Sequence, residues 1–260
     1  TILSAIGELQ TLKPDFISVT YGASGSDNCD STLAIASAIQ NDYAIESVAH
    51  LPCVNLTREV ALQQLSRFQE AGIENILALR GDLPEQGGVS GDFQYASDLI
   101  SLIKEHGDFN IIAACYPEGH LESPDIVSDI RSLKLKVDAG VDHLITQLFL
   151  NNDAFYRFRE RTALAGIQVP LQAGVMPIIN KKQIERIAAI SRVSLPKKFT
   201  TMMERYENNP EAMRDAGIAY AVDQIVDLIT QRVDGIHLYT MNNPYVARKI
   251  YEAVHRLMTV

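Results

Sequence analysis

The sequence predicts an α/β protein built on a parallel sheet, and specifically a (β/α)8 (TIM) barrel. The chain has 260 residues, close to the ~250 that such a barrel needs, and 47% of them are apolar. Four joints place a glycine between a predicted helix and the next predicted strand: Ala71–Ile73, Ala139–Val141, Ala165–Ile167 and Val233–Ile236. Glycine just past a helix supplies a left-handed cap, so the repeated joint indicates helices that lead into parallel strands.

Short apolar runs mark seven strands in chain order, and each run ends at a proline, a glycine or a polar cluster. The predicted strands are 16–20, 47–51, 76–79, 110–116, 143–149, 171–176 and 236–240. Helical spacing of apolar residues predicts helices at 1–12, 31–40, 58–71, 95–105, 125–139, 153–165, 181–191, 211–231 and 245–257, and 195–210 reads as irregular or short-helical.

The chain opens on a helix and shows seven strands, whereas a closed barrel of this type has eight. We therefore expect one further strand ahead of Thr1, and a single barrel domain over residues 1–260. The alternative is an open doubly wound sheet. Its dinucleotide-binding form has no support, because no G-x-G-x-x-G follows any predicted strand.

Composition narrows the class of partner. The formal net charge is −9 without a basic cluster, which argues against nucleic acid, and no apolar run reaches the ~20 residues of a membrane span. Cys29, Cys53 and Cys115 are odd in number and widely spaced, so they fit neither a disulfide framework nor a zinc site. We expect reduced thiols in a cytoplasmic protein, and no bound metal.

The carboxyl ends of parallel barrel strands meet on one face, where the chemistry of such proteins lies. The residues at these predicted ends are polar, aromatic and of mixed charge: Thr20, His50, Arg80-Gly81-Asp82, Tyr116 with His120, Gln147, Gly174 and Tyr239. They suit a large planar ligand held by a few hydrogen bonds. Several of these residues also have a purely structural interpretation: His50 could be a core histidine, and Tyr116 and Tyr239 could simply pack at the rim of the barrel. Asp129 and Lys136, on the predicted helix 125–139, could be solvated.

A set of motifs resembles one family over nearly the whole chain, from Ile17 to about Ala253. The motifs recur in order: Ser18–Ala23, Ala49–Cys53, Ala78–Pro84, Tyr95–Leu99, Tyr116–His120, Lys136–Gly140, Ile145–Phe149, Gly174–Pro177 and His237–Thr240. In this combination the chain resembles the bacterial single-domain methylenetetrahydrofolate reductases.

The resemblance implies an FAD-containing barrel enzyme of one-carbon metabolism, on the route to methionine. It would reduce 5,10-methylenetetrahydrofolate to 5-methyltetrahydrofolate with NADH, NADPH or another electron donor, as a homo-oligomer or a complex subunit. It implies FAD contacts from Thr20, His50, Arg80, Gly81, Asp82, Tyr95, Ala96, Tyr116, His120, Asp129 and Lys136. It also implies catalytic roles for Asp82 beside the flavin and for Gln147, with Gln147 and Tyr239 on the folate.

Three departures bear on this assignment. The family's general acid is a glutamate on the first barrel strand, which we expect ahead of Thr1. Asn243 stands where many members have an arginine for the folate tail, and Lys181 where some have an aromatic residue. Two alternatives therefore remain: a non-catalytic flavoprotein subunit, and a flavin-free pterin-binding barrel methyltransferase.

Overall fold

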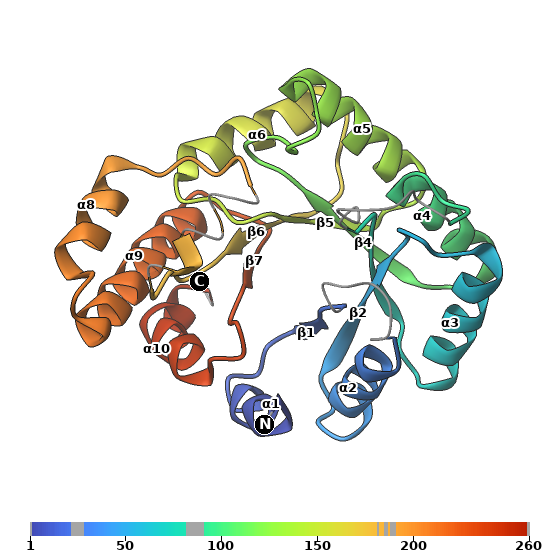
Figure 1. Cartoon of the computed structure of the whole chain (residues 1–260), viewed down its shortest axis with the longest axis horizontal. Coiled ribbons are helices and arrows are strands. Elements are labelled where there is room, and N and C mark those ends of the chain that lie inside the picture. Colours follow the sequence, from blue (N-terminus) through green and yellow to red (C-terminus); the bar gives the residue numbers. More distant parts are fainter. Residues whose placement is uncertain are drawn as a thin grey trace. The chain divides into compact units, whose positions relative to one another are not determined.

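The structure is a computed structural model that describes residues 2–21, 29–81, 91–180, 182–184, 187 and 191–258 (Figure 1). Its strands are β1 (Phe16–Val19), β2 (Glu46–Pro52), β3 (Asn75–Leu79), β4 (Asn110–Cys115), β5 (His143–Thr146), β6 (Leu171–Val175) and β7 (Gly235–Leu238). Its α-helices are α1 (Ile2–Gln10), α2 (Cys29–Asn41), α3 (Arg58–Glu70), α4 (Ala96–His106), α5 (Ile126–Asp138), α6 (Asn152–Leu164), α8 (Lys197–Tyr206), α9 (Pro210–Thr230) and α10 (Pro244–Val254), and a 3-10 turn, η1, spans His255–Leu257.

In the described part of the chain, seven strands form one sheet whose order is the chain order, β1 to β7. The pairings are parallel: Val48 of β2 lies opposite Asn75 of β3, and Gln172 of β6 lies opposite Gly235 of β7. Parallel neighbours in chain order, with helices between successive strands, are the pattern of a (β/α) barrel. The predicted fold class is confirmed, and every predicted strand is present.

The chain divides into two compact units. Unit 1 holds residues 1–114 and 135–143, and unit 2 holds residues 115–134 and 144–260. Unit 1 therefore carries β1 to β3 and nearly all of β4, and unit 2 carries β6, β7 and most of β5.

Helix α3 shows how a helix of unit 1 is specified locally. Thr57 caps its start, with the side-chain oxygen accepting from the backbone N–H of Val60 at 3.3 Å. Ala61, Leu65 and Phe68 recur at spacings of four and three, and all three are buried. Gly72, at φ +71°, then turns the chain toward β3, as the repeated glycine joints predict.

Unit 2 has its own apolar cluster beside β5 and β6. Its buried members are Leu148, Leu150, Ile178, Ile187, Phe199, Met203 and Met213. Phe149 is also fully buried and stacks on Phe155 of α6, with ring centroids 5.3 Å apart. This packing fixes the segment that follows β5.

Several boundaries differ from the sequence prediction by one to three residues. The fifth strand ends at Thr146 rather than Phe149, because the apolar residues that follow pack into the cluster of unit 2 as a loop. Residues 197–206 form a regular helix, α8, which buries Phe199 and Met203 four residues apart. The predicted helix 181–191 lies largely outside the described residues.

Among the described residues, every helix is too short or too polar to span a membrane.

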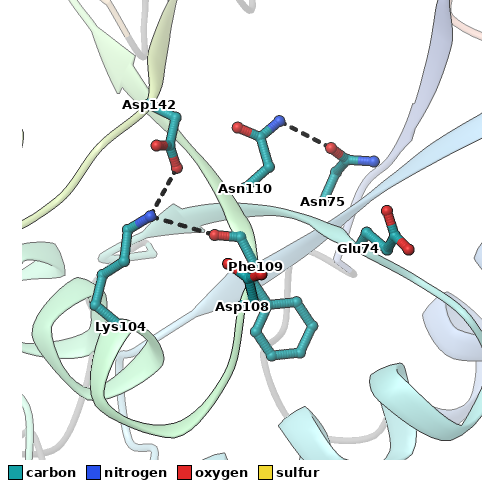
Figure 2. A pocket seen from close by; sticks show the side chains of 7 residues that line it. All are labelled: Glu74, Asn75, Lys104, Asp108, Phe109, Asn110 and Asp142. Atoms are coloured by element: carbon teal, nitrogen blue, oxygen red, sulfur yellow. Dashed lines mark hydrogen bonds and ion pairs between the residues drawn. The ribbon is translucent and has the colours of Figure 1, made fainter.

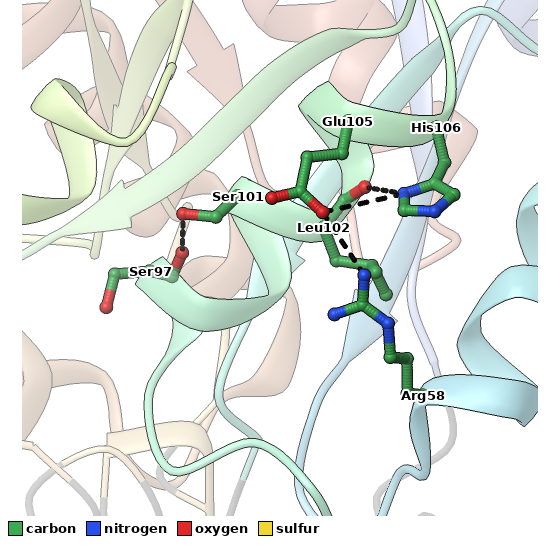
Figure 3. A network of polar contacts seen from close by, with 6 residues as sticks. All are labelled: Arg58, Ser97, Ser101, Leu102, Glu105 and His106. Carbon is green, nitrogen blue, oxygen red and sulfur yellow. Dashed lines mark hydrogen bonds and ion pairs between the residues drawn. The ribbon is translucent and has the colours of Figure 1, made fainter.

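At the surface of unit 1, α3 and α4 are joined by an exposed ion pair, Arg58 to Glu105 at 3.2 Å (Figure 3). Nearby, His106 Nδ1 lies 2.9 Å from the carbonyl of Leu102 within α4. Exposed pairs of this kind contribute little, typically below about 1 kcal/mol, so we assign this network to helix packing.

Candidate active site at the carboxyl ends of the strands

The turn after β3 depends on a glycine. Gly81 has φ +87°, and a Cβ there would lie 2.8 Å from Val54 Cγ1 and 3.0 Å from Pro52 Cβ. The carbonyl of the preceding residue, Arg80, accepts from the backbone N–H of Val54 at 2.7 Å. The turn is thus locked against the end of β2, with bare backbone beside the half-buried Arg80.

The thiol of Cys53, just past the end of β2 in unit 1, lies near charged side chains. Burial, and then the negative charge of Asp98, raise the pKa of Cys53 to about 11, although Arg80 acts in the opposite direction. Cys53 is therefore a neutral, unreactive thiol at physiological pH. Asp98 of α4 and Arg80 of the β3 turn thus both lie close enough to Cys53 to act on its thiol.

The first turn of α4 carries two predicted cofactor residues, Tyr95 and Ala96. The Asp98 carboxylate accepts from the backbone N–H groups of Gln94 and Tyr95 at 3.0 and 2.9 Å, which fixes the start of the helix. Ala96 is buried, whereas Tyr95 is 55% exposed. A large aromatic side chain left this open is available to stack on a planar group.

The other predicted residues of unit 1 lie on separate elements. Thr20 is exposed just after β1, and its carbonyl accepts from the buried Thr32 hydroxyl at 3.4 Å. His50 is half-buried within β2. Lys136, in the last turn of α5, donates its ammonium to the carbonyl of Ala114 at 2.6 Å, so it is directed at the sheet instead of being solvated.

In unit 2, the turn after β4 brings three predicted residues together. The rings of Tyr116 and His120 meet edge to face at 4.7 Å. Asp129, which is only 7% exposed, accepts from the backbone N–H of His120 at 3.3 Å and from the Ser123 hydroxyl at 2.9 Å. The Asp129 carboxylate therefore organises this turn. The alternative interpretation, a solvated helix residue, is wrong for Asp129.

The His120 tautomer follows from its backbone neighbour. The N–H of Glu122 donates to His120 Nδ1 at 3.2 Å, so the neutral ring carries its proton on Nε2. Two residues that sequence reasoning missed hold the same turn: Arg192 donates to the carbonyls of Leu121 and Ser123, and Glu118 accepts from the N–H of Ser194. Their only sequence signal is their charge, and nothing local reveals a partner some 70 residues away.

Gln147 and Tyr239 are brought close through Thr146. The Tyr239 hydroxyl donates to the carbonyl of Thr146 at 2.8 Å, and the Thr146 hydroxyl accepts from the N–H of Gly174 at 2.8 Å. Gln147 lies just past β5, where its N–H donates to the carbonyl of Cys115 at 2.7 Å. The predicted place of Gln147 inside a strand is therefore wrong by one residue, while its place at the strand's carboxyl end is confirmed.

The Gln147 amide has a defined orientation. Its Oε1 accepts from the backbone N–H of Leu148 at 2.9 Å, so a ligand would meet the N–H donors of the amide. Burial raises the pKa of Tyr239, with the nearby Cys115 and Tyr116 acting in the same direction, so Tyr239 stays a neutral donor. Burial lowers the pKa of its edge-to-face neighbour, His237, to about 4.

One of the departures has a structural explanation. Asn243 caps the start of α10, with its side chain accepting from the N–H of Val246 at 3.3 Å, which accounts for an asparagine there. Asp82 and Lys181 lie outside the described residues. In unit 1 the structure thus places Arg80 and Gly81 on the turn after β3 and Tyr95 and Ala96 at the start of α4. In unit 2 it groups Tyr116, His120 and Asp129, and it brings Gln147 close to Tyr239.

A concave region lies at the amino ends of β3 and β4 (Figure 2). Its lining in unit 1 is polar: Glu74, Asn75, Lys104, Asp108, Phe109, Asn110 and Asp142. Lys104 pairs with Asp142 at 2.9 Å, and Asn110 donates to Asn75 at 2.8 Å. These groups satisfy one another, and the amino end of a barrel serves stability, so we assign this region to structure.

No group of three or more potential metal-binding His, Cys, Asp or Glu side chains occurs within the described ranges.

Comparison with known proteins identifies the family. The family model described as methylenetetrahydrofolate reductase matches residues 1–255. The chain belongs to this family.

Individual reductases agree with that assignment. The chain is 39% identical to the 5,10-methylenetetrahydrofolate reductase of Pectobacterium carotovorum subsp. carotovorum, over 99% of this chain and 84% of that enzyme. It is 37% identical to the Escherichia coli (strain K12) enzyme of the same name, over 99% of this chain and 85% of the other. The predicted family is confirmed, and with it the prediction that the chain is an oxidoreductase.

A solved structure supports the fold. An uncharacterised protein from Clostridium thermocellum, described as binding two copies of 5-methyl-5,6,7,8-tetrahydrofolic acid, superposes with a TM-score of 0.63. The superposition covers 100% of this chain and 88% of that chain at 13% identity, so the likeness shows a shared architecture.

Proposed function

We propose that this reductase-family chain converts 5,10-methylenetetrahydrofolate to 5-methyltetrahydrofolate, with electrons from NADH, NADPH or another donor passing through bound FAD. The observation that carries the proposal is the family match over residues 1–255. The orientation of the Gln147 amide agrees with it, because N–H donors suit the carbonyl and ring-nitrogen acceptors of a pteridine. We further propose one catalytic domain, in the cytoplasm.

The described side chains fit FAD in their chemistry. Arg80 and Lys136 carry positive charge, and His120 carries its ring proton on Nε2, so all three suit a pyrophosphate. The exposed ring of Tyr95 suits a planar heterocycle. When bound, FAD would supply the redox chemistry that protein side chains lack.

The protein residues then have separate tasks. We propose that Thr20, His50, Gly81, Ala96, Tyr116 and Asp129 complete the FAD site, with Asp129 acting by holding the His120 turn. Gln147 would orient the folate, and Tyr239, neutral and fixed to the carbonyl of Thr146, would form a wall of the substrate site without serving as a base. Asp82 would stabilise positive charge that develops on the folate.

Cofactor content tests the first part. The purified chain should be yellow, and the FAD released from it by denaturation should approach one equivalent. A colourless protein that binds no FAD in a titration would favour the flavin-free methyltransferase instead.

The two half-reactions test the second part. Stopped-flow traces should show that Gln147→Ala weakens folate binding while the flavin spectrum and its reduction by the donor stay normal. Asp82→Asn should slow folate reduction far more than flavin reduction, because an amide cannot stabilise a cation. Equal slowing of both half-reactions would limit Asp82 to holding the cofactor.

A further inference from the structure

The loop between β5 and α6 is held by a polar face of α9. Tyr220, Gln224 and Asp227 are spaced four and three residues apart, so they lie on one side of that helix. All three bond to residues of the segment that begins two residues after Gln147. The loop and the helix both belong to unit 2.

The central contact is buried. Gln224 is only 6% exposed, and its Nε2 donates to the carbonyl of Phe149 at 2.8 Å. The Tyr220 hydroxyl donates to the next carbonyl, that of Leu150, at 2.6 Å. A buried carbonyl without a donor is destabilised, so these bonds restrict the path of the loop.

Asp227 extends the same arrangement into α6. Its carboxylate accepts from Asn152 Nδ2 at 2.6 Å and from the Tyr156 hydroxyl at 2.6 Å. Asn152 Nδ2 also lies 3.0 Å from the carbonyl of Gln224. The first turns of α6 are thereby fixed to the helix that holds the loop.

Gln147 lies between two fixed points. On one side its own N–H donates to the carbonyl of Cys115 at 2.7 Å. On the other, Phe149 is held by Gln224 through its carbonyl and by stacking through its ring. Only Leu148 separates these anchors, and its N–H is the group that orients the Gln147 amide.

We propose that Gln224 is a positioning residue for the folate reaction: it fixes the carbonyl of Phe149 and so holds the Gln147 amide in its working orientation. The inference rests on the proposed folate role of Gln147. Gln224 touches no substrate, and it acts through Phe149 and Leu148, the two residues that follow Gln147. Small misplacements of an orienting group cost rate or affinity out of proportion to their size.

The test compares Gln224→Met, Gln147→Ala and the double variant. Methionine keeps the length of the side chain and removes the donor. We expect Gln224→Met to raise the KM for methylenetetrahydrofolate roughly three- to tenfold, with the rate of flavin reduction by the donor unchanged. Because the effect passes through Gln147, the double variant should be no worse than Gln147→Ala alone.

Gln64→Met is the matched control. Gln64 is also 6% exposed but lies on α3 in unit 1, so its replacement removes a buried amide elsewhere and should leave the folate KM unchanged. Tyr220→Phe removes one hydroxyl of α9 that donates to the same loop and should raise the folate KM by a smaller factor. It serves as the test if Gln224→Met does not fold.

The outcomes separate the two ideas. If Gln147→Ala leaves the folate KM unchanged, the proposed role of Gln147 is wrong and the positioning role of Gln224 is wrong with it. If Gln147→Ala raises that KM while Gln224→Met and Tyr220→Phe leave it at the wild-type value, only the positioning role is overturned. A double variant with fully additive effects also overturns it.

Discussion

Replacing Gly174 by alanine should be among the most damaging single-methyl changes in this chain. A Cβ at Gly174 would lie 2.1 Å from the carbonyl oxygen of Thr146 and 2.8 Å from Tyr239 Cε2. Ordinary contacts between carbon and oxygen begin near about 3.3 Å, so the Thr146 carbonyl would have to move by roughly 1 Å. That carbonyl belongs to the backbone at the end of β5, where little movement is available.

Two separate costs determine how much the free energy of unfolding should fall. Overpacking a filled core costs about 1–3 kcal/mol, and we expect the upper end because the obstacle is backbone. The moved carbonyl also loses the Tyr239 hydroxyl, now at 2.8 Å, for about 1 kcal/mol more. The free energy of unfolding should fall by about 3–4 kcal/mol, or roughly 10 °C in melting temperature.

Denaturant unfolding measures this directly, since the midpoint should drop while the slope stays constant. Gly7→Ala is the control: its Cβ would lie at an ordinary 3.6 Å from Tyr43 Cε1, inside α1. That variant should be stabilised by about 0.5–1 kcal/mol. A Gly174→Ala protein within about 0.5 kcal/mol of wild type would refute the packing described here.

Three further outcomes can be measured. Burial lowers the pKa of His237 from 6.5 to about 4, so the unfolded chain binds a proton at this histidine more readily than the folded chain does. The free energy of unfolding should therefore fall as the pH drops from about 6.5 towards 4. His237→Asn should make the free energy of unfolding, measured by denaturant titration at each pH, less dependent on pH over this range. Asp129→Ala removes the acceptor that holds the turn at residues 116–123, so FAD affinity measured by fluorescence titration should weaken, and unchanged affinity would contradict the proposed role. Thr57→Ala removes the cap of α3 and should cost about 1 kcal/mol in denaturant unfolding without changing folate kinetics, whereas Thr57→Ser should stay near wild type.

The sequence was sufficient for the elements whose signals are local. Glycine joints such as Gly72 and short apolar runs predicted all the strands, because a buried parallel strand and its preceding cap need no distant partner to be recognised. The predicted fifth strand was too long at its carboxyl end, because its last residues depend on contacts that are distant in sequence. Leu148 and Phe149 are as apolar as a strand, and they form a loop because Leu148 packs into the cluster of unit 2 and Phe149 stacks on Phe155.

The site was predictable in its residue types and less so in its supports. Asp129 and Lys136 carry charges that local reasoning assigns to solvent, yet one organises the His120 turn and the other donates to the carbonyl of Ala114. Gln224 lies in the middle of a long helix, where no pattern marks it. Such contacts join residues far apart in sequence, so they follow from the fold.

Because each of the two units is built from two separate segments of the chain, the protein cannot be divided into the two units by a single cut. The chain leaves unit 1 after Ala114, returns at Leu135 and leaves again after His143, so neither unit is a continuous segment. A gene fragment that stops at Ala114 would lack residues 135–143, including Asp142, whose carboxylate accepts from the N–H of Ile111 at the start of β4. No single cut in the gene therefore separates the two units with both of them intact. An insertion or circular permutation placed within residues 115–143 would interrupt both units at once.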